Sequence, residues 1–342
     1  MEPIKEPQPL VLLSSSPHMH STNSINGAMR DVILALVPAI IAAVYYFGMN
    51  AAIIIVTCVV AAMVFEAICQ KMMKKPVTVC DGSAALTGLL LALCLPPTFS
   101  PGLTILGAFF AIVLGKQLFG GLGCNIFNPA HLGRAICLAS FPQQMTAWVM
   151  PAAAAVSSAT KGADAVSTAT PLAVMRMTEA VWQAGGAATT DKLPPLMNLF
   201  MGNVGGSLGE TCVPALVLGG IYLIVKGHVD WRIPVFYLAT VAAITGIYGA
   251  VMGYPSIFPL YHLCAGGLMI GAFFMATDWV TSPITKKGRI VFAIGLGVLT
   301  ALIRLRGSYT EGVCYSILIM NMVTPFIDRC VHNTSFGGGA KK

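Results

Sequence analysis

Long apolar runs, separated by short polar or glycine- and proline-rich connections, dominate the chain. A helix that crosses the hydrocarbon core of a membrane needs about 20 apolar residues, or fewer if it is short or broken. The pattern therefore predicts ten helical segments, five on each side of a polar, alanine-rich interval from 142 to about 210. The segments are Val32 to Phe47, Ala51 to Cys69, Ser83 to Leu95, Leu103 to Leu118, Ala130 to Phe141, Cys212 to Val225, Pro234 to Met252, Leu260 to Ala276, Ile290 to Ile303 and Val313 to Ile327.

The third and fifth segments are too short to span a bilayer comfortably. Irregular backbone is tolerated at membrane depth only where protein or a cavity satisfies its polar groups, so we expect broken or tilted helices that flank a site. Five crossings per half is an odd number, so a repeat of one half in the other would be inverted in the membrane. Ala85 to Pro101 and Gly266 to Pro283 are a weak echo of such a repeat, because both are small-residue-rich runs that end in a proline-containing turn.

Composition strengthens the membrane interpretation. Hydrophobic residues make up 56% of the chain and charged residues 10%, with a mean hydropathy of +0.79, whereas soluble domains are about 25% charged. We therefore expect an all-α polytopic membrane protein, with about ten transmembrane helices in two possible inverted five-helix repeats. The net charge of +7 does not indicate nucleic acid, because the basic residues occur in short clusters beside apolar runs. In such positions basic residues determine the topology of a membrane protein, so the expected partner is the lipid bilayer.

The distribution of basic residues predicts the orientation. With the N-terminus in the cytoplasm, fifteen of the 20 Lys and Arg residues fall on the inner side, which supports cytoplasmic N- and C-termini. Arg304 and Arg306 fall on the outer side, where they either bind an external partner or snorkel at a helix end. The predicted divisions are a cytoplasmic segment 1–30, a first membrane half 31–141, an external loop 142–210, a second membrane half 211–328 and a cytoplasmic tail 329–342.

A glycine-rich turn before the fifth segment carries two carboxamides, Asn125 and Asn128. The turn fits neither the phosphate-loop template nor the dinucleotide-binding GxGxxG template. If the stretch is helical, the two side chains share one side of a turn and offer uncharged donors and acceptors to the edge of a heterocycle. The alternative for Asn128 is structural, because asparagine before Pro129 is a good helix N-cap.

Three carboxylates lie in or near the apolar segments. Glu66, inside the second segment, is either a relay or a packed neutral acid, because burial without a partner raises a carboxyl pKa. Asp81 and Asp278 stand at predicted cytoplasmic ends, as solvated or capping residues or as cation ligands or proton carriers. The histidines are scattered and the cysteines form no CxxC pair, so the sequence predicts no metal site.

Within the polar interval, Asp164, Ser167, Ala169 and Thr170 form the pattern DxxSxAT. A threonine hydroxyl is a poor nucleophile and needs an outside catalyst to be used covalently. The pattern resembles the signature read by flavin transferases, which move FMN from FAD onto threonine as a phosphoester, although Thr168 replaces the usual glycine. This resemblance implies that Thr170 carries the FMN and that Asp164 and Ser167 belong to the recognition signature. The alternative is that an alanine-, serine- and threonine-rich loop produces the string by chance.

Further stretches extend the resemblance over nearly the whole chain: Ser14 to Ala39, Asp81 to Pro97, Phe119 to Ala135, Ser167 to Ala173 and Gly271 to Pro283. Together they resemble the family that contains the D subunit of the Rnf ion-translocating electron-transport complex. The B subunit of the sodium-translocating NADH:quinone reductase shares the pattern but usually has a longer N-terminal region.

The resemblance implies a flavoprotein of the prokaryotic inner membrane that carries electrons between ferredoxin and NAD through partner subunits and couples this flow to Na⁺ or H⁺ transport. It implies non-covalent riboflavin as a second flavin, with Asn125 and Asn128 as its contacts, and Asp278 as a residue of ion coupling. The implied partners are the other Rnf subunits, including an external FMN-bearing subunit, and a flavin transferase for maturation.

Two other functional classes stay open. The predicted architecture suits a redox-inactive transporter or channel equally well. A scaffold protein with an unmodified threonine is the third possibility. The DxxSxAT pattern favours the flavoprotein interpretation over these two classes, because neither a transporter nor a scaffold needs an FMN acceptor.

Overall fold

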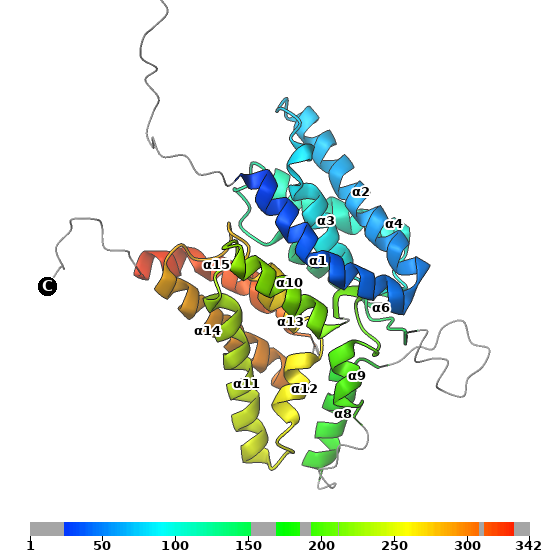
Figure 1. The fold of residues 1–342 in the computed structure, drawn as a ribbon, viewed down its shortest axis with the longest axis vertical. Coiled ribbons are helices and arrows are strands. Elements are labelled where there is room, and N and C mark those ends of the chain that lie inside the picture. Colours follow the sequence, from blue (N-terminus) through cyan, green and yellow to red (C-terminus); the bar gives the residue numbers. More distant parts are fainter. Residues whose placement is uncertain (1–23, 152–168, 185–192, 211, 308–310, 332–342) are drawn as a thin grey trace, which may run out of the picture.

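The computed structural model describes residues 24–151, 169–184, 193–210, 212–307 and 311–331. Within these ranges the chain forms helices joined by turns, and no β-strand is formed (Figure 1). In chain order the helices are α1 (Ile25–Phe47), α2 (Met49–Met72), η1 (Val79–Asp81), α3 (Ser83–Leu93), α4 (Pro101–Phe109), η2 (Phe110–Gln117), α5 (Pro129–Ser140), α6 (Pro142–Met145), α8 (Pro171–Gln183), α9 (Leu196–Met201), η3 (Leu208–Glu210), α10 (Val213–Val225), α11 (Arg232–Met252), α12 (Phe258–Cys264), α13 (Leu268–Ile270), η4 (Gly271–Met275), α14 (Lys286–Arg306) and α15 (Val313–Cys330).

Helices α1 to α5, called the first group below, contain two long and two short members. The chain reverses between α1 and α2 at Gly48, whose φ of +68° is a conformation that favours glycine. Helix α3 has 11 residues and α5 has 12, so each rises about 16–18 Å, roughly half of a bilayer core of about 30 Å. The short third and fifth segments predicted from the sequence are therefore confirmed.

Helices α10 to α15, called the second group, contain the sharpest break. Helix α12 and the stretch formed by α13 and η4 are bent by 66° at a short interruption, so that together they form a broken span or a re-entrant loop. The interruption includes Gly266, whose φ is +70°. A Cβ atom there would lie 2.7 Å from the Leu172 side chain. The break falls in the eighth predicted segment, where the sequence pattern predicted a continuous helix.

The two groups share one order of packing. In the first group the second helix, α2, packs against α3 and α4, and in the second group α11 packs against α12 and α14. The fourth helix contacts the fifth in both groups, and α1 contacts α10 where the groups meet (Figure 1). This shared order agrees with the five-helix repeat predicted from the sequence.

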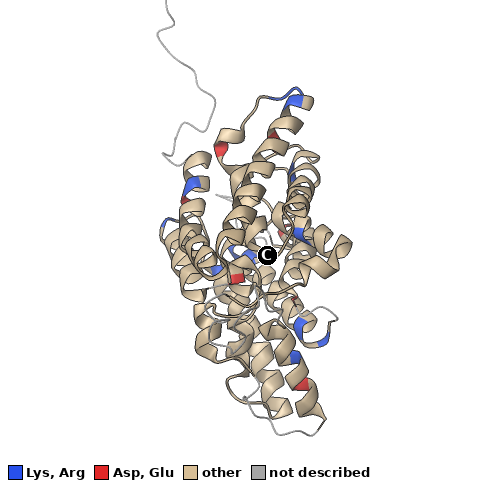
Figure 2. Ribbon diagram, turned by 90° about the vertical axis from the view of Figure 1, so that its right-hand side faces the viewer, with Lys and Arg blue, Asp and Glu red and all other residues tan. Residues whose placement is uncertain are grey.

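The helices suit a lipid environment. Four of them (α1, α2, α11 and α14) are long and apolar enough to cross a membrane, and the bent pair is a fifth candidate. Large apolar side chains such as Ile41, Val56 and Ile247 are exposed on their outer faces. Figure 2 shows long stretches of helix without Lys, Arg, Asp or Glu. The chain is therefore an all-α polytopic membrane protein.

The interval between the two groups is not a bare loop. It contains α6, α8 and α9, and α8 packs its apolar face on α12 and the turn before it. Trp182 of α8 lies against Tyr254 and Phe258, with ring centroids 4.8 and 6.5 Å away. At the other end of the helix, Leu172 belongs to the same apolar cluster, so the start of α8 beside Thr170 also packs against the second group.

Small residues allow α10 to approach its neighbours closely. A Cβ atom on Gly219 would lie 2.2 Å from the Ala35 carbonyl oxygen of α1, and one on Gly220 would lie 2.3 Å from the Phe273 ring. Real Cβ atoms do not come this close to other atoms, so these glycines set the distance between the two groups. Membrane helices commonly use small residues in this way.

Gly219→Ala is expected to lower the free energy of unfolding by about 1–3 kcal/mol, because the added methyl group overpacks the contact with a rigid backbone oxygen. Gly246→Ala is the control, since its Cβ would meet only Pro259, at 3.6 Å, and alanine favours a helix by about 1 kcal/mol. Thermal unfolding of the purified protein in detergent measures both. Equal melting temperatures for the two variants would contradict the packing argument.

Candidate functional site

A cavity of about 310 Å³ lies between the two groups and is lined by three of the site residues predicted from the sequence, Asn125, Asn128 and Asp278. Its wall is mostly apolar and comes from α1, α3, the loop before α5, α10 and the turn after η4. The polar side chains on the wall include Ser83, Lys116, Asn125, Asn128, His228 and Asp278. Residues from both groups are needed to build it.

Asn125 and Asp278 meet across this cavity. The Asn125 Nδ2 donates hydrogen bonds to the Phe127 carbonyl oxygen at 3.1 Å and to the Asp278 Oδ2 at 3.3 Å. Asp278 follows η4, and its Oδ2 also accepts a hydrogen bond from the Thr281 hydroxyl at 3.2 Å. Burial raises the pKa of Asp278 by more than these hydrogen bonds lower it. The fold thus brings a carboxamide and a carboxyl of raised proton affinity side by side, 153 positions apart in sequence.

Asn128 has a structural role at the cavity wall. Its Oδ1 accepts hydrogen bonds from the backbone N–H groups of Ala130 and His131, which makes it the N-cap of α5. Its Nδ2 donates to the Met275 carbonyl oxygen at 3.1 Å, at the end of η4. The two carboxamides do not share a helical turn, because α5 begins only at Pro129 and Asn125 lies in the preceding loop. The condition of that prediction, a helical stretch, is therefore not met, and the N-cap alternative for Asn128 is confirmed.

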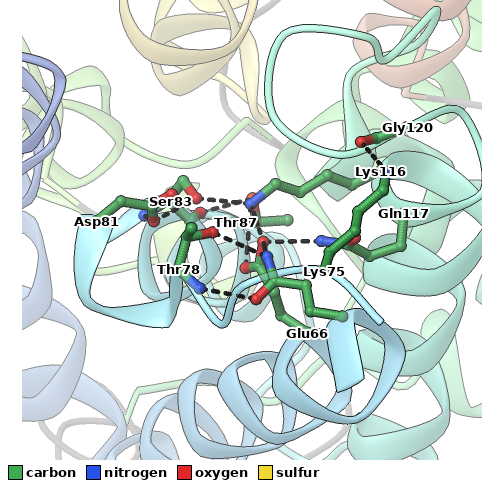
Figure 3. Close-up of polar contacts among 10 residues, drawn as sticks. Glu66, Lys75, Thr78, Asp81, Ser83, Thr87, Lys116, Gln117 and Gly120 are labelled. Atoms are coloured by element: carbon green, nitrogen blue, oxygen red, sulfur yellow. Dashed lines mark hydrogen bonds and ion pairs between the residues drawn. The ribbon is translucent and has the colours of Figure 1, made fainter. Parts of the chain in front are cut away.

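A buried ion pair stands behind one side of the cavity. The Lys116 Nζ lies 2.8 Å from the Glu66 Oε1, and both side chains are almost fully buried (Figure 3). Lys116 also donates to the Ser83 hydroxyl at 2.6 Å, and the Gln117 Nε2 donates to Glu66 at 2.8 Å. Lys116 and Gln117 are neighbours in the π-helix η2, a local widening that is frequent at functional sites. The fold therefore gives Glu66 a lysine partner from a distant part of the chain, which the sequence pattern did not show.

Thr170 lies elsewhere, at the first turn of α8. It is the N-cap of this helix: its hydroxyl accepts a hydrogen bond from the Ala173 N–H at 3.2 Å, and Pro171 occupies the first helical position. The residue is buried. A helix N-terminus presents free N–H groups and a partial positive charge, which favour a phosphate. The other two residues of the motif, Asp164 and Ser167, lie outside the part of the chain that the structure describes.

Several residues at the cavity were not predicted. Lys116, one of the fifteen basic residues that the sequence analysis assigned to the inner side, lines the wall. Trp279 and His228 also line it, and the Trp279 Nε1 donates to the His228 carbonyl oxygen at 2.7 Å. The His228 ring pairs with Asp31 of α1 at 2.8 Å. The one available signal was the position of Trp279 directly after Asp278. In the described ranges no three His, Cys, Asp or Glu side chains are placed to hold a metal ion.

Lys116→Met is expected to destabilise the protein by about 3–5 kcal/mol, because it leaves the Glu66 carboxylate buried without its partner. A second substitution, Glu66→Leu, is expected to recover much of that loss, since it removes the unpaired charge. Lys75→Met is the control: this exposed lysine donates only to the Gly120 carbonyl oxygen. Denaturant or thermal unfolding in detergent compares the four proteins, and a Lys116→Met variant as stable as Lys75→Met would refute the ion-pair argument.

Comparison with known proteins places the whole chain in a family. The chain is 47% identical over 328 residues to the D subunit of the proton-translocating ferredoxin:NAD(+) oxidoreductase complex of Clostridium ljungdahlii, covering 95% of this chain and 96% of that protein. It is 43% identical over 328 residues to the D subunit of the Na(+)-translocating ferredoxin:NAD(+) oxidoreductase complex of Acetobacterium woodii, covering 95% of each. It is 38% identical over 333 residues to the D subunit of the ion-translocating oxidoreductase complex of Stutzerimonas stutzeri, covering 93% and 94%.

A family model agrees with these relatives. It matches residues 12–337, which include both helical groups, the interval between them and every residue of the cavity named above. The match therefore covers far more than the short flavin-attachment pattern. The chain belongs to the NQR2, RnfD, RnfE family.

Proposed function

We propose that this protein is the D subunit of an Rnf-type membrane complex that carries electrons between ferredoxin and NAD⁺ and couples their flow to Na⁺ or H⁺ translocation. The observation that carries the proposal is full-length similarity, at 47% and 43% identity, to two proteins with this name. Such a protein is one section of an electron path and needs the other Rnf subunits to complete an oxidoreductase. The protein positions cofactors, and the cofactors supply the redox chemistry.

The first cofactor is FMN, joined to Thr170 through a phosphoester. Its support is the DxxSxAT pattern and the place of Thr170 at the N-terminus of α8, where the helix dipole and free N–H groups stabilise an anion. Because Thr170 is buried in the folded chain, the flavin transferase acts before α8 has packed fully. With both termini in the cytoplasm, this flavin faces the external side and exchanges electrons with the FMN of an external partner.

The second cofactor is riboflavin, held without a covalent bond in the cavity between the two groups. A mostly apolar space of about 310 Å³ with a few polar groups suits the flat ring system of a flavin. Asn125 hydrogen-bonds the polar edge of the ring, and Asn128 shapes the wall through its bond to Met275. Lys116 stays neutralised by Glu66, so the cavity carries no unbalanced lysine charge.

Asp278 couples the redox state of this site to an ion. Its carboxyl lies on the cavity wall, and its raised proton affinity means that a nearby change of charge alters its occupancy by H⁺ or Na⁺. With riboflavin bound, the flavin would supply the redox chemistry, and the Asp278 carboxyl would hold or release the cation as the charge in the cavity changes. This exchange is the step at which electron flow drives ion transport.

The main alternative within the family is the B subunit of a sodium-translocating NADH:quinone reductase, because the family model includes NQR2. The names of the relatives favour the Rnf assignment. The two functions differ in their electron donor and acceptor. Ferredoxin-dependent NAD⁺ reduction by the purified complex supports the proposal, whereas NADH-dependent quinone reduction supports the alternative.

Thr170→Asn is expected to abolish the FMN-sized increment in intact mass and the in-gel flavin fluorescence when the protein is made together with a flavin transferase. Asparagine keeps the helix cap but has no hydroxyl to esterify, so the loss does not come from a weakened α8. Thr178→Val is the control, because its hydroxyl lies on the same helix and bonds only to the Val174 carbonyl oxygen at 2.8 Å. Retention of FMN by Thr170→Asn would disprove the attachment site, and absence of FMN from the wild type would favour a transporter or a scaffold.

Asn125→Leu and Asp278→Asn are expected to separate flavin binding from ion coupling in the assembled complex. The first removes a ligand hydrogen bond worth about 1–3 kcal/mol, so riboflavin binds roughly five- to 150-fold more weakly. The second keeps the shape of the cavity but cannot titrate, so riboflavin stays while the dependence of ferredoxin-driven NAD⁺ reduction on Na⁺ or pH is lost.

Asn198→Leu is the matched control, because this asparagine lies in α9, outside the cavity. Riboflavin released by denaturation, and the rate of NAD⁺ reduction with and without Na⁺, are the measurements. Full riboflavin content in Asn125→Leu would show that the second flavin binds at another site. An unchanged dependence on Na⁺ or pH in Asp278→Asn would show that this carboxyl group takes no part in ion coupling.

A further inference from the structure

A second buried polar cluster lies farther along α5, beyond the cavity. From the N-cap Asn128 at the cavity wall, His131 and Arg134 follow three and six residues later, so these two side chains share one face of the helix. Arg134 pairs with Glu311, which stands before α15. Glu210, in η3, completes the cluster: both it and Arg134 are more than nine-tenths buried. The ion coupling at Asp278 does not involve any member of this cluster.

Glu210 and Glu311 lie within hydrogen-bonding reach of each other. Each keeps one carboxyl oxygen, Oε1, that is buried and receives no hydrogen bond from any residue in the described ranges. Two ionised carboxylates can only accept hydrogen bonds, so they cannot satisfy each other. One proton on either of them supplies the missing donor. The arrangement of the two carboxyl groups therefore favours the binding of one proton between them.

The placement of hydrogen-bond donors at the cluster leads to the same result. The titratable groups that interact with the pair are Arg134 of α5, Cys94 beside α3, Cys314 of α15 and Arg304 of α14. His131 lies beside Arg134. Arg304 serves the carbonyl oxygens of His262 and Ala265 at the break of the bent span. Arg304 keeps its positive charge, but its hydrogen bonds go to those carbonyl oxygens and not to the pair. Arg134 pairs with Glu311, yet the Oε1 atoms of Glu210 and Glu311 still receive no hydrogen bond within the described part of the chain, and a proton on one carboxyl group supplies a further donor.

The pair also lies close to the break in the second group. A Cβ atom on Gly267 would be 3.9 Å from both the Arg134 Nη1 and the Glu210 Oε1, so these two atoms border the same space beside the interruption. The neighbouring Gly266 packs against Leu172, two residues after Thr170. The cluster therefore occupies the region between the cavity at the start of α5 and the start of α8.

We propose that Glu210 and Glu311 form a proton-binding site in which the two carboxyl groups share one exchangeable proton beside Arg134. In the binding step one carboxylate accepts H⁺ and becomes a carboxylic acid that donates to the other, and no electron is transferred. Burial and the neighbouring carboxyl raise the pKa of Glu210 by more than Arg134 lowers it. If the flavins are placed as proposed above, the site lies between them, and an electron that arrives on either flavin raises its proton occupancy.

Infrared spectroscopy of the purified complex tests this site directly, because a protonated carboxyl group has its own carbonyl stretching band. We expect a band that disappears as the pH is raised, shifts in D₂O and is absent from Glu210→Gln and from Glu311→Gln. Glutamine imitates the protonated acid in shape and hydrogen bonding, so both variants are expected to fold. Glu210→Asp is expected to shift the band without removing it.

Glu179→Gln is the matched control, because Glu179 is buried to the same extent as Glu210, with 7% exposed, and stands beside His262. The band must survive this substitution. A band that persists unchanged in both Glu210→Gln and Glu311→Gln overturns the proposal. A band that vanishes on addition of Na⁺ at constant pH also overturns it, because the site would then take a metal cation in place of the proton.

Reduced-minus-oxidised infrared difference spectra of the same samples test whether the proton-binding site responds to the redox state of the flavins. We expect flavin bands together with a carboxyl band that is lost in Glu210→Gln. Flavin bands without a carboxyl band would refute the redox link and leave the proposed flavin function intact. A pH-dependent carboxyl band in a complex without flavin bands would support the proton-binding site and refute the proposed flavin function.

Discussion

The whole structure depends on one constraint: inside a bilayer every polar group needs a partner from the protein, because neither water nor lipid supplies one. Short and broken helices release carbonyl groups at depth, and side chains of other helices bind them. Asn128 of the first group donates to Met275 of the second. Arg304 donates to His262 and Ala265, where the bent span is interrupted. The hydrogen bond from Asn128 to Met275 therefore also connects the two groups of helices.

The same constraint explains why a cavity forms where it does. Helices α3 and α5 are too short to cross a membrane, so their ends meet the second group well inside the protein and leave a space between them. A charged wall residue there must be neutralised, and Glu66 does this for Lys116. The cavity therefore offers a ligand mostly apolar surface, a carboxamide and one carboxyl group, Asp278. This combination suits an uncharged ring whose redox state changes.

Much of the fold could be predicted from the sequence, because apolar length alone determines where a membrane helix forms. All ten predicted segments contain a helix. The break in the eighth segment could not be predicted, since it depends on the positive φ of Gly266 and on its contact with Leu172. Arg304 was expected either to bind an external partner or to snorkel at a helix end, and neither role fits its contacts. It is buried, because the broken helix needs its guanidinium group.

The candidate site was predictable only in part. Resemblance to a family indicated Asn125, Asn128 and Asp278, but no local pattern shows that the loop before α5 touches the turn after η4. Lys116 was misjudged for the same reason, because a lysine beside an apolar run has the same local sequence whether it faces water or Glu66. Contacts between residues far apart in the sequence decide whether such a side chain is buried or exposed. Only the three-dimensional structure shows these contacts.

The spacing along α5 connects the two sites electrostatically. Asn128 stands at the cavity and Arg134 at the carboxyl pair, six residues later, which corresponds to a rise of about 9 Å. At that separation one unit charge acts on another with about 2 kcal/mol if the effective dielectric constant is about 20, which is more than one pKa unit. If the cavity holds the flavin proposed above, an electron on it at about this separation would be enough to change the proton occupancy that we propose for Glu210 and Glu311, without any movement of the helices. Such coupling needs only that α5 stay rigid, and the N-cap at Asn128 and the ion pair at Arg134 fix the helix at both places.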